Sequence, residues 1–382
     1  MVRSRPQPTM NGTVLLDPAA CRTRQQRLCR WLGTAGVDLA IFVAPEQIEY
    51  FTGHRWDFRF SPVAALRADG QMLLICPDKP VEAEAVDDLR IYAAKWKSTL
   101  RLDQREAAAA VLADWLAAGP TPRRVGVEFS SCPPHVSRCC ADSELVDLEP
   151  EVLRLRRRKD ADELALLKRA IAATGRMYER AREIIEPGLS ELTMFSELQR
   201  VAVEACGEML SGTGNDYACG VRGGPPRDRG CEPGELYILD LGPAYRGYFA
   251  DNARTLAVDG QPTDNQLAAW QHVCGALTLV EQRARPGLSC RELYAEVEAW
   301  LAQAPVGSWS SHLGHGIGLY VHETPHLNPN WDDKLEVGDV IAVEPALYGP
   351  ELRCGMRIEN DYRVTESGLE LLSPFPLELS GV

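Results

Sequence analysis

The sequence lacks long hydrophobic runs and any surplus of positive charge. No uninterrupted apolar segment reaches the length that a membrane-spanning helix requires. The basic amino terminus has no apolar core, so it does not resemble an export signal. A formal net charge of −13 over 382 residues argues against nucleic acid or an anionic membrane as the main partner. We therefore expect no nucleic-acid partner and no membrane association.

Paired cysteine motifs are also missing. The twelve cysteines are scattered, without a CxxC motif and with one adjacent pair, Cys139–Cys140. In a chain of this size without an export signal, reduced and mostly buried thiols are expected. This pattern favours a cytoplasmic enzyme or binding protein. The length, with 45% hydrophobic and 25% charged residues, is typical of two globular domains.

Residues 1–156 are predicted to form a small α/β domain. Asp17-Pro18 can start a helix that runs to about Gly33, and the segment QREAAAAVLADWL is a second predicted helix. The segments LAIFVAP and RVGVEF are predicted strands, and Asp69-Gly70 indicates a hairpin. The domain is expected to end at the basic run of residues 156–159, which we expect to be a solvated junction.

Residues 157–382 are predicted to form a second domain in which one pattern occurs twice. In the first copy, helices are expected near 161–186 and 190–207, with strands near 236–242 and 247–258. In the second copy, helices are expected near 263–285 and 289–303, with strands near 339–346 and 355–365. The segments GELYILD and GDVIAVE share a glycine, an acid, an apolar run and a terminal carboxylate at the same offset. This repetition predicts two αβ halves related by internal duplication, with a site between them.

Acidic residues are predicted to face each other in both halves. One hairpin would set Asp240 opposite Asp251, and a second turn would set Glu344 opposite Glu359. Like charges facing each other across strands are destabilising, and apolar neighbours increase the cost. One such pair could be a shared-proton dyad or an accident at a sheet edge. Two pairs in the two repeats are better explained by divalent cations bound between them.

Three of the seven histidines lie within the segment SSHLGHGIGLYVHETP, residues 310–325. One neutral imidazole added to four carboxylates forms a ligand set rich in hard oxygen donors. This set suits two divalent ions such as Mn²⁺, Co²⁺, Fe²⁺ or Zn²⁺, which can share bridging carboxylates. Two such ions can lower the pKa of a water molecule held between them and polarise a carbonyl group.

These residues, in this order, resemble the methionine aminopeptidase / Xaa-Pro dipeptidase / creatinase family. The matching positions are Asp240 in LDLG, Asp251 in FADNART, His315 in GHGIGLYVHE, Glu344 in VEPALY and Glu359 in GMRIEND. The amino-terminal segments YFTGH and ADGQMLLI look like the additional domain of the Xaa-Pro and creatinase branch. The resemblance implies an α/β protein of the α+β kind. A pita-bread catalytic domain of two pseudo-repeated ααββ halves would follow a creatinase-like amino-terminal domain.

The resemblance also implies roles for individual residues. Asp251 and Glu359 would bridge two metal ions, and Asp240, His315 and Glu344 would be terminal ligands. Glu344 would also help to activate water, and His322 would stabilise the tetrahedral intermediate. Arg357 and His54 would contribute to substrate binding, with His54 and Trp56 in a region that reaches the partner subunit of a homodimer.

Two positions depart from the family pattern. The family's peptidases place a catalytic histidine upstream of the first ligand strand, but this chain has no histidine between His135 and His272. Gly223, or its neighbour Arg222, stands at that position. The family's substrate-binding histidine lies four residues before the metal-binding one; Ser311 occupies that position here, and His312, displaced by one residue, is the candidate that would bind substrate in its place through a shifted loop.

Three functions remain open from the sequence. The first is a two-metal Xaa-Pro aminopeptidase or dipeptidase that cleaves small proline-containing peptides with a metal-bound hydroxide. The second is a non-peptidase metal-dependent hydrolase or lyase that acts on a small molecule, which loss of the upstream histidine would suit. The third is a non-catalytic binding protein. For His322 a structural role in the core is the alternative, and for His312 a position outside the site.

Overall fold

The computed structural model describes residues 12–214 and 216–380, and the chain divides into two compact units. One unit spans residues 15–156, and the other contains residues 157 onward together with the segment that ends at Val14. Among the described residues, no helix combines the length and the apolar character needed to cross a bilayer.

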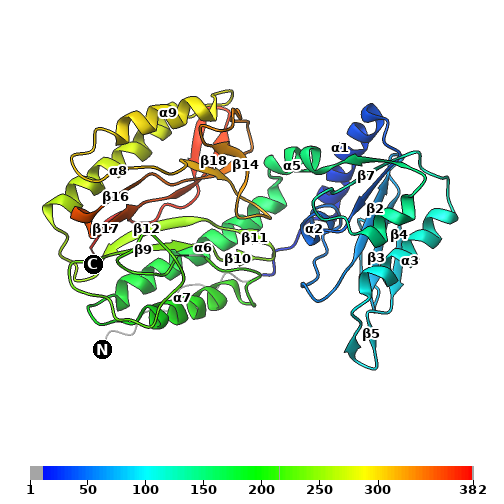
Figure 1. Ribbon diagram of the computed structural model, residues 1–382, viewed down its shortest axis with the longest axis horizontal. Coiled ribbons are helices and arrows are strands. Elements are labelled where there is room, and N and C mark those ends of the chain that lie inside the picture. Colours follow the sequence, from blue (N-terminus) through cyan, green and yellow to red (C-terminus); the bar gives the residue numbers. More distant parts are fainter. Residues whose placement is uncertain (1–11, 215, 381–382) are drawn as a thin grey trace. The chain divides into compact units, whose positions relative to one another are not determined.

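The amino-terminal unit is built on a six-stranded mixed sheet with strand order β4-β3-β2-β1-β7-β8 (Figure 1). The first helix begins after Asp17, whose carboxylate accepts a hydrogen bond from the Ala19 backbone N–H at 3.1 Å. The second and third strands form the antiparallel hairpin predicted at Asp69-Gly70. The strands are β1 Leu39–Phe42, β2 Val63–Arg67, β3 Met72–Pro77, β4 Asp88–Tyr92, β5 Lys95–Trp96, β6 Thr99–Leu100, β7 Arg124–Val127 and β8 Glu144–Asp147. The helices are α1 Pro18–Ala35, α2 Pro45–Thr52, α3 Gln104–Ala117, α4 Pro134–Ser137, η1 Arg138–Cys140 and α5 Glu149–Arg157.

The second unit contains two helix pairs, α6–α7 and α8–α9, and each pair precedes antiparallel strands (Figure 1). The four helices confirm the predicted duplication; they are α6 Ala161–Ile184, α7 Glu191–Cys206, α8 Asp264–Arg283 and α9 Cys290–Leu301. A capping box starts α8, because Thr263 Oγ1 accepts from the Gln266 N–H and Gln266 Oε1 accepts from the Thr263 N–H.

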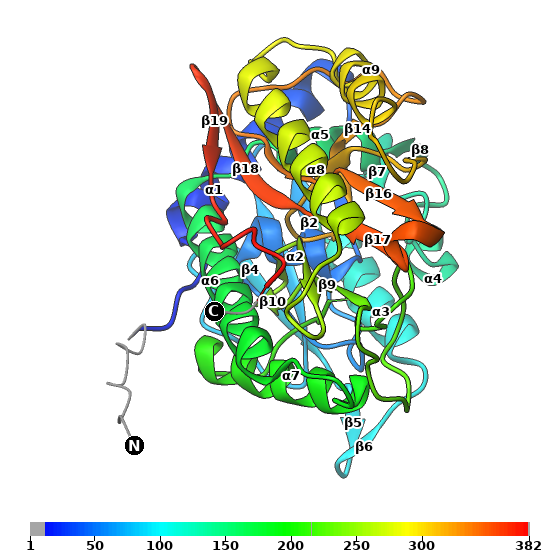
Figure 2. The ribbon, with the colours of Figure 1, turned by 90° about the vertical axis from the view of Figure 1, so that its left-hand side faces the viewer.

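The strands of this unit form short sheets between the helix pairs. The first half contributes β9 Leu236–Leu241, β10 Ala244–Tyr245, β11 Tyr248–Phe249 and β12 Asn252–Ala257. The second half contributes β13 Gly314–Gly316, β14 Glu323–Leu327, β15 Val340–Val343, β16 Ala346–Gly349, η2 Pro350–Leu352, β17 Cys354–Arg357, β18 Asn360–Thr365 and β19 Gly368–Leu371. The five-stranded sheet has the order β14-β13-β15-β18-β19. In Figure 2, α8 lies over this half, where it packs against β16, β17 and β19.

Three predicted strands are interrupted, and each interruption falls at an acidic residue. Asp251 precedes β12, Glu344 separates β15 from β16, and Glu359 separates β17 from β18. The strands β13 and β14, which contain or flank the histidine-rich segment, were not predicted because glycine-rich sequence is a weak strand signal.

The prediction that residues 156–159 form a solvated junction is wrong. Arg156, Arg157 and Lys159 are all buried. Arg157 forms an ion pair with Asp339 at 2.8 Å, and Arg156 donates to a side-chain amide oxygen in its own unit at 3.0 Å. A run of charges in the sequence does not disclose such distant partners, and buried charges are retained when they are paired.

Candidate metal centre

Three buried or half-buried carboxylates meet where the two halves join. Asp240 lies near the end of β9, Asp251 precedes β12, and Glu359 follows β17. One oxygen atom of each carboxylate lies within 4.8 Å of one in the other two. The Glu359 backbone N–H donates to the Ala253 carbonyl at 2.9 Å, which joins the first half to the second beside these side chains.

The two acidic pairs differ in register. The ladder of β9 and β12 sets Asp240 opposite Ala253, so Asp251 is a diagonal neighbour on the same face and not the directly opposite residue that was predicted. The intervening segment forms the separate hairpin β10–β11, which the sequence did not indicate. In the second half, the register of β15–β18 and β16–β17 continues through the break and places Glu344 opposite Glu359, as predicted.

His315 faces two of these acidic groups from β13. Its Nε2 atom lies 3.6 Å from Asp251 Oδ2 and 3.5 Å from Glu344 Oε1. Its Nδ1 atom lies 3.0 Å from the Gly316 carbonyl oxygen, so a proton on Nδ1 leaves the Nε2 lone pair directed at the carboxylates. A side chain at Gly314 would collide with the Ala342 carbonyl group, so the close pairing of β13 with β15 requires glycine there.

Burial raises the pKa of every carboxyl group in this cluster. The pKa of Asp240 is raised to about 7 by desolvation, which the nearby Arg357 only partly offsets. Desolvation and then the neighbouring acids raise the pKa of Asp251 and of Glu359 well above the usual values. Desolvation also raises the pKa of Glu344.

These donors fit divalent cations. Burial lowers the pKa of His315 to about 4, so the imidazole is neutral and can act as a ligand near neutral pH. The Oε2 atom of Glu359 is buried and has no hydrogen-bond partner among the described residues. Four crowded carboxyls with an orphaned oxygen and a neutral imidazole form a costly arrangement without a positive charge between them. Divalent cations would remove that cost.

The other two histidines of the segment lie at the same cluster. The His322 ring stacks on the His315 ring with centroids 3.7 Å apart and planes 13° apart. His312 Nε2 lies 3.2 Å from Glu344 Oε1, so the displaced histidine does point at the cluster. The side chain of His322 is exposed, which contradicts the alternative that it is a structural histidine of the core.

A buried ion pair holds the turn that carries His322. Lys159 Nζ lies 3.0 Å from Glu323 Oε2, and both side chains are almost completely buried. The other oxygen of Glu323 accepts a hydrogen bond from the Tyr320 N–H at 3.0 Å. Lys159, which the sequence assigned to a solvated junction, therefore positions the residue next to His322.

The Arg357 guanidinium forms ion pairs with carboxylates of the cluster and its surroundings. Its Nη2 atom pairs with Asp216 and lies 3.1 Å from Asp240 Oδ2, while its Nη1 atom lies 3.9 Å from Glu344 Oε2. Burial alone would lower the pKa of this guanidinium, but the acidic neighbours raise it. In the structure the guanidinium neutralises and orients these acids, and a contribution of Arg357 to substrate binding stays a prediction. Asp216 was missed because nothing in its local sequence distinguishes it.

Residues 216–224, here called the Asp216 loop, occupy the region where the upstream histidine was expected. The Gly224 N–H donates to Asp216 Oδ1 at 2.7 Å, and the Tyr217 N–H donates to the Gly224 carbonyl at 2.8 Å. A Cβ atom on Gly223 would collide with the Asp216 carboxylate. Gly223 therefore cannot carry a histidine in this loop conformation.

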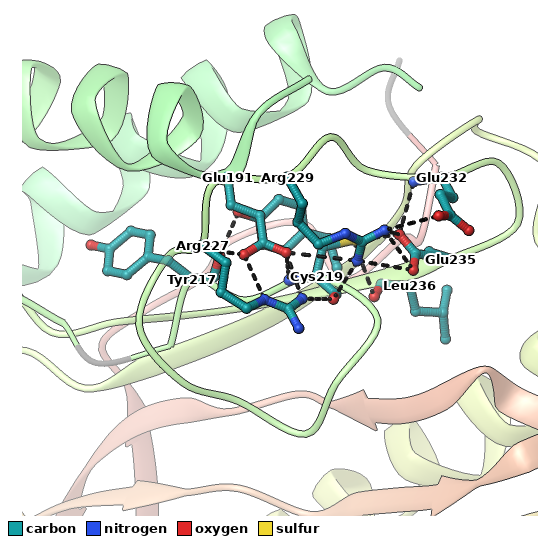
Figure 3. Close-up of polar contacts among 9 residues, drawn as sticks. Glu191, Tyr217, Cys219, Arg227, Arg229, Glu232, Glu235 and Leu236 are labelled. Atoms are coloured by element: carbon teal, nitrogen blue, oxygen red, sulfur yellow. Dashed lines mark hydrogen bonds and ion pairs between the residues drawn. The ribbon is translucent and has the colours of Figure 1, made fainter. Parts of the chain in front are cut away.

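A network of charged side chains anchors the chain on both sides of this loop (Figure 3). Glu191, the first residue of α7, is fully buried and accepts a hydrogen bond from the Cys219 N–H at 3.0 Å. The Arg227 guanidinium donates to both oxygens of Glu191, at 3.0 and 2.6 Å. Arg229 pairs with Glu235 at 3.0 Å. The loop is thus tied to α7 and to the start of β9.

Glu191→Ala is expected to lower the free energy of unfolding by about 2–3 kcal/mol, because the buried Cys219 N–H and the Arg227 guanidinium lose their acceptor. Equilibrium urea unfolding measures the loss. Glu204→Ala, which removes an exposed carboxylate from the same helix, is the control and should change stability by less than about 0.5 kcal/mol. Equal stability of the two variants would contradict the anchoring role of Glu191.

Comparison with known proteins agrees with this site. Residues 165–366 match the metallopeptidase family M24, and residues 24–158 match the creatinase/prolidase N-terminal domain. The chain belongs to metallopeptidase family M24. An uncharacterized peptidase of Bacillus subtilis, YqhT, is 34% identical over 248 residues, which are 64% of this chain and 69% of that protein. An uncharacterized peptidase of Staphylococcus aureus strain MW2 is 24% identical over 379 residues, with 92% of this chain and 99% of that protein covered.

Solved structures with this fold include an X-Pro aminopeptidase from Thermotoga maritima and an Xaa-Pro dipeptidase from Bacillus anthracis. Each superposes with a TM-score of 0.78, at 23% and 24% identity, over 94% and 95% of this chain and 100% and 99% of those chains. These likenesses establish the pita-bread fold behind a creatinase-like domain. This M24 protein is a metallopeptidase, and its family depends on divalent metal ions.

His54 belongs to the amino-terminal unit of the metallopeptidase. Its ring lies 6.1 Å from the ring of Trp56, and burial lowers its pKa. A contribution of His54 to substrate binding stays a prediction.

Proposed function

We propose that this metallopeptidase is an Xaa-Pro aminopeptidase or dipeptidase with two divalent ions. The observation that carries the proposal is the position of Asp251, which belongs to two groups of donors at once. Its carboxylate lies with Asp240 and Glu359 on one side and faces His315 on the other. A carboxylate shared in this way suits a bridging ligand between two ions. The names of the two structural neighbours support proline-containing peptides as substrates.

In this proposal, Asp251 and Glu359 would be shared by two ions, Asp240 would complete the first site, and His315 and Glu344 would complete the second. Mn²⁺, Co²⁺, Fe²⁺ and Zn²⁺ suit this mixture of oxygen and nitrogen donors. When bound, the ions supply a water molecule of lowered pKa and a Lewis acid for the scissile carbonyl.

The remaining side chains handle protons and charge. Glu344, whose pKa is raised by burial, accepts a proton from the attacking water and passes it to the leaving amine. His312, 3.2 Å from Glu344, keeps that carboxylate oriented through this transfer. Partial desolvation of the ring at the cluster, followed by its neighbour His315, lowers the pKa of His322 to about 4, so it is neutral and can donate an N–H to the developing oxyanion.

Hydrolysis assays test this proposal. The protein is loaded with Mn²⁺ or Co²⁺ and offered Xaa-Pro dipeptides and Xaa-Pro-Yaa tripeptides, with a chelator-treated sample as the control. We expect proline liberation from dipeptides or release of the first residue from tripeptides, lost with chelator. Two bound ions per chain without hydrolysis of any of these peptides would overturn the proposal.

The second candidate is a non-peptidase metal-dependent hydrolase or lyase acting on a small molecule. One observation favours it: the Asp216 loop excludes a side chain at Gly223, where the family's peptidases place a histidine. Inactivity on all peptides despite full metal loading would support this candidate.

Three further properties stay predictions. Size measurement tests the homodimer, fractionation tests the cytoplasmic location, and metal analysis tests the identity of the ions.

His322→Gln is expected to reduce kcat about 10²- to 10³-fold with a smaller change in KM, because an oxyanion donor acts mainly in the transition state. Steady-state kinetics on an Xaa-Pro dipeptide measures the effect. The matched control is His272→Gln on α8, whose ring stacks on Trp300 away from the cluster, and it should leave kcat unchanged. A loss confined to KM would contradict the assigned role of His322.

A further inference from the structure

We propose that Arg222 binds the free α-carboxylate of the substrate, so that this peptidase acts on Xaa-Pro dipeptides in preference to longer peptides. The inference rests on the proposed function and names the substrate class more narrowly. It concerns the Asp216 loop, in which Arg222 lies beside the glycine that replaces the expected histidine.

Arg222 is available for a ligand. Its side chain is exposed, and it forms no ion pair with a carboxylate of the described residues. The other arginines near the loop are already engaged: Arg227 with Glu191, and Arg357 with the acids of the cluster. Arg222 is therefore the guanidinium that these contacts leave free to receive an anion.

The Arg222 guanidinium is also held in place. Its central carbon lies over the Tyr348 ring, 3.9 Å from the ring centre, in a cation–π contact. A contact through the face of the planar group leaves the N–H donors on its edge, which match the two oxygens of a carboxylate. Tyr348 lies on β16 and thus presents Arg222 from a rigid element.

Tyr348 links Arg222 to the candidate metal centre. Burial raises the pKa of the Tyr348 hydroxyl, while the positive charges of Arg357 and Arg222 oppose the shift and Glu344 adds to it. In the β16–β17 ladder Ala346 is opposite Arg357, and Tyr348, two residues further along β16, lies on the same face, so the ring below Arg222 is a diagonal neighbour of Arg357. An anion on Arg222 would lie close to the reacting groups.

The loop conformation keeps this geometry fixed. Asp216 accepts from the Gly224 N–H and pairs with Arg357, so the loop is fastened directly to the cluster. On its outer side, the Glu191–Arg227 network fastens it to α7 (Figure 3). The Asp216 carboxylate occupies the position that a Gly223 side chain would take, so it packs against the loop next to Arg222.

The chemistry of a dipeptide matches this placement. In an Xaa-Pro dipeptide, only the proline nitrogen and Cα separate the scissile carbonyl from the carboxylate. Extending the peptide converts that carboxylate into a neutral amide and moves the negative charge away. A guanidinium close to the centre would therefore favour dipeptides by the energy of a charge-assisted bidentate contact.

The test compares Ala-Pro with Ala-Pro amide and the tripeptide Ala-Pro-Ala, using the metal-loaded wild-type protein, R222Q and R222K. The wild type should cleave Ala-Pro with a kcat/KM at least about tenfold above the other two. In R222Q, kcat/KM for Ala-Pro should fall about 10- to 100-fold, chiefly through KM, with less than about threefold change for the amide. R222K keeps the positive charge but lacks the two parallel N–H donors of a guanidinium, so its kcat/KM for Ala-Pro should lie between those of the wild type and R222Q. The control R200Q removes an exposed arginine from α7 and should match the wild type.

A binding measurement gives a readout without catalysis. Calorimetry of Ala-Pro with metal-free protein should show at least about tenfold weaker binding in R222Q than in the wild type. An equal loss on the acid and the amide in R222Q would overturn the inference, as would a wild type that cleaves both equally while remaining an Xaa-Pro peptidase. Failure to cleave any of the three peptides would overturn the proposed function, and the inference with it.

Discussion

Asp251→Ala is expected to abolish the metal-dependent peptidase activity, with a loss in kcat/KM of more than about 10³-fold. Asp251 belongs to both groups of donors, so in the proposed two-ion centre its removal would weaken both sites at once. Activity on an Xaa-Pro dipeptide and metal content by elemental analysis measure the effect. Metal content should fall from two ions per chain to one or none. The control Asp228→Ala removes an exposed acid of the same half and should retain both properties.

The melting temperature of an Asp251 variant, with and without metal, distinguishes a metal ligand from a structural residue at this position. In metal-free protein, Asp251 is a buried acid among other acids, so the neutral variant Asp251→Asn should melt at or above the temperature of the wild type. With saturating Mn²⁺ the order should reverse, because only the wild type gains the stabilisation that binding confers on the folded state. Full metal content and activity in either variant would contradict the role of Asp251.

The chemistry of the cluster was predictable where it depends on short-range sequence. Glu344 and Glu359 flank one tight hairpin, so the length of the turn determines their register and places them opposite each other. Asp240 and Asp251 are separated by a segment that forms its own hairpin, β10–β11, and this shifts the pairing to a diagonal one. The sequence pattern could indicate that the two acids share a face but not their offset.

Other features depend on partners distant in the sequence. Lys159 is buried because Glu323, far along the chain, accepts its charge, and no local signal indicates this pairing. The sequence showed that the upstream histidine is missing, but not that Asp216 fills the space above Gly223. It also did not indicate that Arg222 lies over the Tyr348 ring, since a contact between a loop and a distant strand leaves no periodic pattern.

Metal affinity is expected to rise steeply with pH between about 5.5 and 7.5. In the metal-free protein, desolvation raises the pKa of Asp240 to about 7 and those of Asp251 and Glu359 well above their usual values. Asp240 therefore carries a proton near pH 6, the raised pKa values of the other two carboxyls act in the same direction, and a cation must displace protons to bind. His315, with a pKa of about 4, is already neutral and releases none in this range. Each displaced proton makes the apparent affinity about tenfold greater per pH unit.

Calorimetric titration of metal-free protein with Mn²⁺, in buffers of different ionisation enthalpy, counts the protons released at each pH. We expect at least one proton per chain at pH 6 and fewer at pH 8. The stability of the metal-free fold changes in the opposite direction: the raised pKa of Asp240 stabilises it most below about pH 4, and that contribution is lost as the pH rises through about 7. The increase in melting temperature caused by Mn²⁺ should therefore become larger from pH 5.5 to 7.5.

The matched control is Glu128→Gln. It removes a buried carboxyl whose pKa desolvation also raises to about 7, but which belongs to the amino-terminal unit. This variant should leave the number of protons released on Mn²⁺ binding unchanged. An affinity independent of pH across this range would contradict the assignment of these carboxyls as ligands, because a protonated carboxyl must release its proton to bind a cation.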